Sequence, residues 1–211
     1  MPKEPEFYYT ALWLAAICIV IFSFQEMMPS LTNQITLVSK DAFSHPWTFI
    51  TSIFAHGSMG HLLSNMFALV LFGLILEKHI GTKKFLFVFF ATGIFAGFIG
   101  MLYYNALLGA SGAIMGILGT LAIMRPGMVV WVSYIPMPMI IAAGVWAFLD
   151  YMGIFTPGNV ANISHLAGIG LGLIIGVIFR LSFPKVKIEK RKTTSEEEKE
   201  LDEYEKNYRL R

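Results

Sequence analysis

Long apolar runs separated by short polar stretches fill the first 184 residues of the chain. A helix that crosses a bilayer needs about 20 mostly apolar residues. Six runs approach this length and predict six transmembrane helices, at about residues 7–24, 61–76, 85–104, 112–124, 139–152 and 163–183. The predicted fold class is therefore an all-α membrane protein. The first run lacks a convincing small-residue cleavage site, which favours a retained helix over a cleaved signal peptide.

The stretch between the first two runs, residues 25–60, is too apolar for a simple linker. Its segment 46–54 places four apolar side chains at helical spacing: Phe49, Ile50, Ile53 and Phe54. Such a pattern is typical of a short interfacial helix that is half sunk in one leaflet. We therefore expect residues 25–60 to form a membrane-embedded loop rather than a solvated one.

Composition separates this body from the end of the chain. Of the 211 residues, 55% are apolar and only 14% are charged, whereas soluble domains carry about 25% charged residues. Residues 180–211 hold ten of the sixteen Lys and Arg and eight of the fourteen Asp and Glu. These values exclude a soluble enzyme and a disordered chain, and a single cysteine excludes a disulfide scaffold. We expect one membrane domain, residues 1–184, and a charged tail, residues 185–211.

Basic residues indicate the orientation of the predicted helices. They follow the second, fourth and sixth apolar runs, whereas the other connections hold only Lys40: the residues concerned are Lys78, Lys83, Lys84, Arg125, Arg180 and the basic residues of the tail. Because Lys and Arg accumulate on the cytoplasmic side of membrane proteins, both termini are expected to be cytoplasmic. The chain is then a multi-pass protein of the cell membrane. A net charge of +2 gives no reason to expect a nucleic-acid partner.

A few uncharged polar residues lie within the apolar runs, where polar groups are costly and usually functional. A rise of 1.5 Å per residue places Ser111 about 20 Å, and His165 about 22 Å, from the cytoplasmic charges on their helices. By the same rise Asn65 lies at about 18 Å and His61 at about 24 Å. Any one of them could be a structural polar residue. Their shared depth, in the outer part of the membrane, favours a common function.

Glycine spacing predicts which helices meet. Small residues recur on one side of the fourth and sixth predicted helices: Gly112, Gly116 and Gly119 on the fourth, Gly168, Gly172 and Gly176 on the sixth. Such faces let two helix backbones approach closely in lipid. Ser111 and His165 lie at the same outer end of these faces, so the crossing should bring the two side chains together.

A serine beside a histidine is the nucleophile and base pair of acyl transfer. The tetrahedral intermediate of that reaction also needs hydrogen-bond donors for its oxyanion. His61 and Asn65 are four residues apart and share one helical face. The helix that starts after Gly109 adds backbone N–H groups without intrahelical partners. The sequence thus contains nucleophile, base and oxyanion donors at one membrane depth.

Three motifs carry a resemblance to the rhomboid intramembrane serine proteases. The segment GASGAIMG at 109–116 resembles their GxSGxxxG motif, and HGSMGHLLSN at 56–65 resembles HxxxxHxxxN. The segment SHLAG at 164–168, followed by Gly172, is similar to AHxxGxxxG. The order of the three motifs, on the second, fourth and sixth helices, also agrees with that family.

The resemblance implies a six-helix rhomboid core and a serine endopeptidase that cuts in or near transmembrane segments of other proteins. Ser111 would be the nucleophile and His165 the general base, acting as a dyad without cofactor or metal. Asn65, His61 and the Ser111 backbone N–H would form the oxyanion hole. The remaining motif positions would have supporting roles: His56, Gly109, Gly112, Met115 and Gly168. The partners would be transmembrane substrates and the lipid bilayer.

Two positions depart from the family pattern. Met115 stands where many rhomboids have an aromatic residue packed on the catalytic histidine, and Ser164 stands where alanine is usual. A thioether can pack on an imidazole, but it orients the ring less strictly. Neither departure removes a group that the chemistry needs.

Other functions fit these residues less well. A Ser–His–Asp triad that includes Asp150 is disfavoured, since the family works as a dyad and Asp150 is expected to be a helix-end or loop hydrogen-bond partner. A metal site built from the histidines lacks the HExxH pattern, and an aspartyl protease would need GxGD. A catalytically weak or inactive rhomboid-like protein that binds transmembrane helices is the main alternative function. A channel or transporter is a more distant one.

Overall fold

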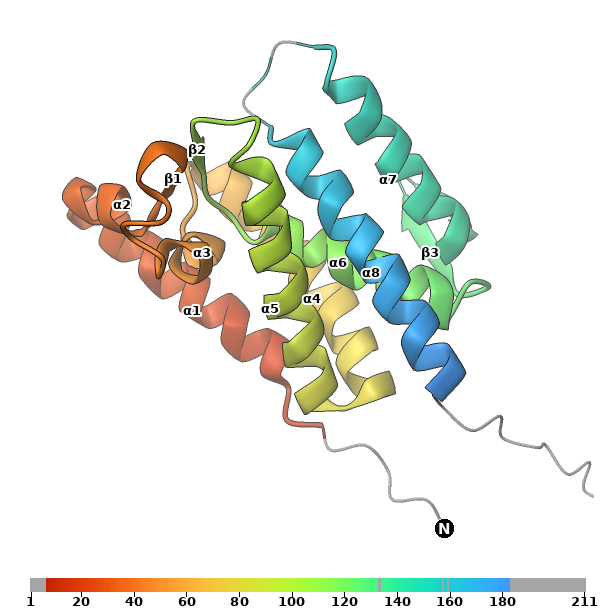
Figure 1. The fold of residues 1–211 in the computed structure, drawn as a ribbon. Coiled ribbons are helices and arrows are strands. Elements are labelled where there is room, and N and C mark those ends of the chain that lie inside the picture. The colour runs from red at the N-terminus through yellow and green to blue at the C-terminus, as the bar shows by residue number, and fades with distance from the viewer. Residues whose placement is uncertain (1–6, 133, 157, 159, 183–211) are drawn as a thin grey trace, which may run out of the picture.

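The computed structural model describes residues 7–132, 134–156, 158 and 160–182. Helices cover part of every apolar run: α1 (Thr10–Met27), α4 (Met59–Ile80), α5 (Thr82–Gly100), α6 (Ser111–Met124), α7 (Met139–Gly153) and α8 (Asn162–Ser182). Four of them, α1, α4, α5 and α8, are long and apolar enough to cross a membrane, while α6 and α7 are shorter apolar helices. The start of α1 and the end of α8 lie at the same end of the bundle (Figure 1). The predicted tail, residues 185–211, lies outside the described residues.

Helix α6 lies at the centre of the bundle and contacts α4, α5, α7 and α8. Ten of its fourteen residues are buried, because small side chains let neighbouring helices come close. Its most extensive contact is with α8, where the Thr120 hydroxyl donates a hydrogen bond to the Gly172 carbonyl at 3.0 Å. The predicted crossing of the two glycine-lined faces is therefore confirmed.

The connection between α1 and α4 is folded. It contains α2 (Pro29–Ile35), β1 (Leu37–Val38), η1 (Ser39–Asp41), α3 (Thr48–Thr51) and η2 (Ser52–Phe54). Strand β1 pairs antiparallel with β2 (Ala106–Leu107), with Leu37 opposite Leu107. This pairing ties the connection to the loop that leads into α6, so it helps to fix the start of that helix.

The predicted helix at residues 46–54 is shorter and divided. Its α-helical part ends at Thr51 and continues as a 3-10 turn to Phe54. A 3-10 turn rotates each residue by about 120° rather than 100°, so the predicted common face is lost. Ile53 is accordingly 3% exposed while Ile50 is 45% exposed. Only part of the predicted apolar face therefore packs on the bundle.

A β-hairpin between α6 and α7 was not predicted from the sequence. Strand β3 (Val129–Val132) pairs antiparallel with β4 (Ile135–Pro138), with Val130 opposite Met137. Val130 is buried while Val129 and Trp131 on either side of it are exposed, the alternation expected of a half-buried strand. The hairpin leads directly into α7 and fixes where that helix begins.

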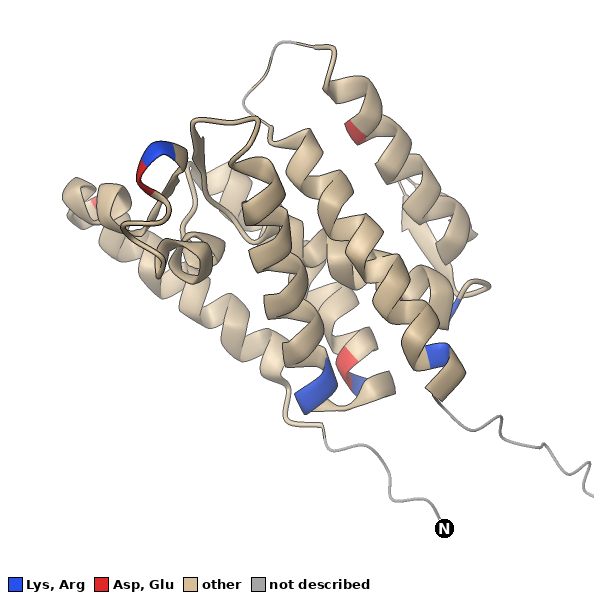
Figure 2. Ribbon diagram, in the orientation of Figure 1, with Lys and Arg blue, Asp and Glu red and all other residues tan. Residues whose placement is uncertain are grey.

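Lys and Arg gather at the end of the bundle where α5 begins and α8 ends (Figure 2). At this end the Arg125 Nε–H donates to the His79 ring. The Arg180 guanidinium donates to the Ile123 carbonyl at 3.1 Å. These contacts hold the ends of α4, α6 and α8 together on the basic side of the molecule.

Glu77 at the end of α4 holds the start of α1. Its carboxylate is fully buried and accepts the backbone N–H groups of Thr10 at 2.9 Å and Ala11 at 3.1 Å. The Thr82 hydroxyl donates to the same carboxylate at 2.7 Å. The first N–H groups of a helix have no partner inside it, so Glu77 satisfies donors of α1 that would otherwise be buried and unpaired.

Replacing Glu77 by glutamine should therefore destabilise the fold. One carboxylate oxygen would become an amide nitrogen, which cannot accept the backbone N–H groups. The free energy of unfolding should fall by about 2 kcal/mol, the scale of hydrogen bonds to charged groups. Thermal unfolding in detergent measures the effect. The exposed Glu26 at the other end of α1 provides the matched control, Glu26→Gln. Equal melting temperatures for both variants would contradict the assigned role.

Candidate active site

The four polar residues predicted to share one depth line one cavity. The cavity has a volume of about 880 Å³ and is lined by residues of α4, α6, α7 and α8 and of the adjoining loops. Ser111, His165, His61 and Asn65 are all among its lining residues. Met115 and Trp146 also line it. The structure therefore brings the predicted site residues together.

Ser111 is the first residue of α6, and the loop before it requires glycine. Gly109 has φ +116°, a conformation that L side chains rarely adopt. A Cβ at this position would also come within 2.6 Å of the His61 ring. The Gly109 N–H donates to the Ser52 carbonyl at 2.8 Å, which anchors the loop. Gly109 thus allows Ser111 and His61 to face the same cavity.

His165 lies in the first turn of α8 and is 9% exposed. Its Nδ1 is 2.9 Å from the Asp150 Oδ1, near the end of α7. Among the described residues, no hydrogen bond joins the Ser111 hydroxyl to the His165 ring, although both line the cavity. Catalytic hydrogen bonds are often long in a free enzyme and shorten when substrate binds.

The position of Asp150 corrects one expectation. The sequence predicts a helix-end or loop hydrogen-bond partner for Asp150, but its side-chain partner is the imidazole of His165. The two residues are fifteen apart and belong to different helices, so helical spacing gives no signal for the contact. The approach of α7 to α8 is what creates it.

His61 and Asn65 lie one turn apart on α4. The Asn65 Nδ2 donates to the His61 carbonyl at 2.8 Å. An amide nitrogen carries two hydrogens, so the second remains available to the cavity. The Ser58 hydroxyl caps the helix by accepting the His61 N–H at 3.2 Å. The cap fixes the first turn of α4, and with it the position of His61.

His56 precedes α4 and supports the site from behind. Its ring lies against that of His61, with centroids 5.2 Å apart. Its backbone is held by Gln25 of α1 through two hydrogen bonds of 3.0 and 3.2 Å. Burial, and then the neighbouring His61, lower the pKa of His56 to about 4. The ring is therefore neutral at physiological pH.

The glycine motif positions have a packing role. A Cβ on Gly168 would lie 2.2 Å from the Gly112 carbonyl oxygen. A Cβ on Gly112 would lie 2.5 Å from the Ala96 side chain. Glycine at both positions therefore lets α6 approach α8 and α5 closely enough to bring Ser111 and His165 to one cavity. Met115, at the position that is aromatic in many rhomboids, is half-buried in the wall of this cavity.

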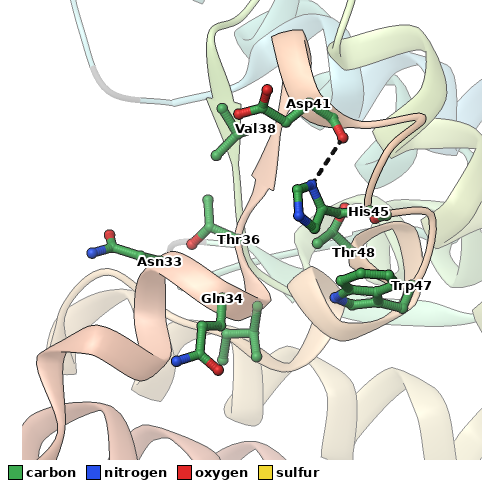
Figure 3. Close-up of a pocket in the computed structure, with 9 residues that line it drawn as sticks. Asn33, Gln34, Thr36, Val38, Asp41, His45, Trp47 and Thr48 are labelled. Atoms are coloured by element: carbon green, nitrogen blue, oxygen red, sulfur yellow. Dashed lines mark hydrogen bonds between the residues drawn. The ribbon is translucent and has the colours of Figure 1, made fainter.

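A second cavity, of about 470 Å³, lies in the connection between α1 and α4 (Figure 3). Its walls include Asn33, Gln34, Thr36, Asp41, His45 and Trp47. The His45 Nδ1 lies 3.3 Å from the backbone carbonyl of Asp41, and the dashed line in Figure 3 marks this contact. None of the predicted site residues lines this second cavity.

Comparisons with known proteins agree with the motifs. A family model described as "Rhomboid domain" matches residues 44–182. The chain is 34% identical over 128 residues, 56% of its length, to "Rhomboid protease GluP" of Bacillus subtilis. It is 24% identical over 177 residues, 78% of its length, to "Rhomboid protease GlpG" of Serratia proteamaculans. It is 30% identical over 156 residues, 66% of its length, to "Rhomboid protein 1, mitochondrial" of Saccharomyces cerevisiae. The matches span 24%, 60% and 44% of these three relatives.

Proposed function

The chain belongs to the rhomboid family, and from this premise we propose that it is an intramembrane serine endopeptidase. It would hydrolyse peptide bonds in or near transmembrane segments of other membrane proteins. One observation carries the proposal: a serine at a helix start and a histidine with one free ring nitrogen line the same cavity of an apolar bundle. The protease names of two relatives support it.

Ser111 would attack the carbonyl carbon of the scissile bond, while His165 accepts the hydroxyl proton. Nδ1 of His165 faces Asp150, so Nε2 is the nitrogen left for this role. The bond to the leaving amine then breaks, and His165 returns the proton to that amine. Water would hydrolyse the acyl-enzyme by the same two proton transfers in reverse roles. No cofactor takes part in these steps.

The tetrahedral intermediate carries a negative charge, and the donors around Ser111 are suited to receive it. Asn65 and His61 both line the cavity with Ser111. The backbone N–H of Ser111 belongs to the first turn of α6, where N–H groups lack helical partners. Together the three donors would form an oxyanion hole of the kind that acyl transfer requires.

Replacing Asn65 by alanine should slow cleavage by about 10²-fold, on the scale of losing one oxyanion donor. The rate constant for a transmembrane substrate in liposomes measures this loss. Asn33→Ala, in the wall of the second cavity, serves as the matched control and should leave the rate unchanged. An Asn65→Ala rate within about 3-fold of the parent would exclude Asn65 from the oxyanion hole.

The proposed membrane arrangement uses all six helices. In it α6 and α7 also cross, both termini are cytoplasmic, and residues 1–184 form the protease domain. The gathering of basic residues at the end where α5 begins and α8 ends supports this orientation (Figure 2). The tail, residues 185–211, would lie in the cytoplasm. We propose the cell membrane as the location.

One observation favours the alternative of a weak or inactive protein that binds transmembrane helices: in the described structure Ser111 and His165 share no hydrogen bond. The deciding experiment uses the purified chain in liposomes with a single-span substrate that contains helix-breaking residues. Mass spectrometry of the products should find a cut in or near the span. A substrate that co-purifies with the chain but stays intact would support the alternative.

A further inference from the structure

Asp150 is a buried carboxylate on a helix that is otherwise apolar. It lies near the end of α7 and is 7% exposed. Among the described residues, its carboxylate has one hydrogen-bond partner, the His165 ring, whose Nδ1 lies 2.9 Å from the Asp150 Oδ1. A buried carboxylate is costly unless a partner compensates its charge. The hydrogen bond from the His165 ring therefore offsets part of the burial cost of the Asp150 carboxylate.

The contact also decides which nitrogen of His165 carries the proton. A carboxylate oxygen accepts hydrogen bonds, so the Nδ1 that lies 2.9 Å from the Asp150 Oδ1 must carry a hydrogen. In a neutral imidazole the other nitrogen, Nε2, then holds the lone pair. That nitrogen is the one that can accept a proton from a group in the cavity. The second oxygen of Asp150, Oδ2, has no hydrogen-bond partner among the described residues.

We propose that Asp150 is a positioning residue for His165, and this inference rests on the proposed Ser111–His165 chemistry. Its carboxylate selects the tautomer with hydrogen on Nδ1, holds the ring plane, and stabilises the imidazolium that forms when Ser111 gives up its proton. Ser111 and His165 remain the reacting pair, and Asp150 of α7 acts on the reaction only through the His165 ring.

The test combines nuclear magnetic resonance with kinetics on the full chain in lipid nanodiscs. With ¹⁵N-labelled histidine, the His165 signals are assigned by their loss in His165→Ala. In the parent chain they should show hydrogen on Nδ1. In Asp150→Asn and Asp150→Ala the His165 signals should show hydrogen on Nε2, or a mixture of the two tautomers. Hydrogen on Nε2 in the parent chain would overturn the proposal directly.

Kinetics should show a loss in kcat rather than in KM. A carboxylate that orients a histidine base and stabilises its protonated form raises kcat by up to about 10⁴-fold. We expect Asp150→Asn to lower kcat by at least about 10²-fold and to change KM little. Asp41→Asn, at the exposed acid of the first loop, is the matched control. An unchanged His165 tautomer together with kcat within about 3-fold of the parent would refute the role of Asp150.

The two proposals fail in different ways. If the chain is not a serine protease, Ser111→Ala leaves cleavage unchanged or the parent cleaves nothing. The tautomer measurement does not depend on proteolysis, so it still reports whether Asp150 sets the state of the His165 ring. Conversely, cleavage that needs Ser111 but not Asp150 supports the proposed function and rejects the positioning role.

Discussion

Replacing Ser111 by alanine should abolish cleavage of a transmembrane substrate, with a loss of about 10⁴-fold or more in kcat. The reason is chemical rather than structural: the variant removes the one atom that would form the acyl bond. Alanine fits a helix start and deletes only a hydroxyl without a hydrogen-bond partner among the described residues, so the fold should not change. The reconstituted cleavage assay measures the rate, and a fluorophosphonate probe measures whether residue 111 still reacts.

Ser64→Ala is the matched control for this prediction. Ser64 also lines the cavity, but its hydroxyl donates to the His61 carbonyl within α4 at 3.0 Å. Its loss should leave cleavage and labelling intact. His165→Ala should abolish both, since the serine would lose its base. Cleavage that survives Ser111→Ala would reject the serine mechanism, and a parent chain that resists the probe would favour the inactive alternative.

The cavity residues could be found from sequence because three physical signals coincide. Polar groups are rare in an apolar body, so Ser111 and His165 stand out. Cytoplasmic charges give a common origin from which depth can be counted along straight helices. Glycine spacing then indicates that α6 and α8 meet. Each signal depends on local sequence or on regular helix geometry, so it can be derived without knowing the tertiary structure.

Contacts that arise from loops and from the tilt of helices could not be found in this way. The pairing of Asp150 with His165 depends on how α7 approaches α8, and no sequence interval encodes that approach. The hairpin of β3 and β4 lies in the connection between the fourth and fifth predicted helices. Each strand has only four residues and none of them is charged, so no alternation of apolar and polar side chains indicates a strand. The contact between Glu77 and the start of α1 joins residues 67 positions apart, so no helical spacing indicates it.

A methyl group added at Gly172 should disturb both stability and activity. A Cβ there would lie 2.1 Å from the Gly116 carbonyl oxygen and 2.9 Å from its Cα. Both atoms belong to the backbone of α6, so no side chain can turn aside and the two helices must separate. Overpacking of this kind lowers the free energy of unfolding by about 3 kcal/mol. A shift of about 1 Å between Ser111 and His165 would reduce cleavage by about 10²-fold.

Gly170→Ala provides the comparison that isolates this contact. Gly170 lies on the same helix, two residues away, and an added Cβ would meet no atom within 4 Å. Alanine is a better helix former than glycine by about 1 kcal/mol, so this variant should keep or raise the melting temperature and retain full cleavage. Thermal unfolding in detergent and the liposome assay together separate the two cases. Equal melting temperatures and cleavage rates for Gly172→Ala and Gly170→Ala would show that the α6–α8 contact tolerates a wider spacing. Close approach of the two backbones would then no longer explain how Ser111 and His165 reach one cavity.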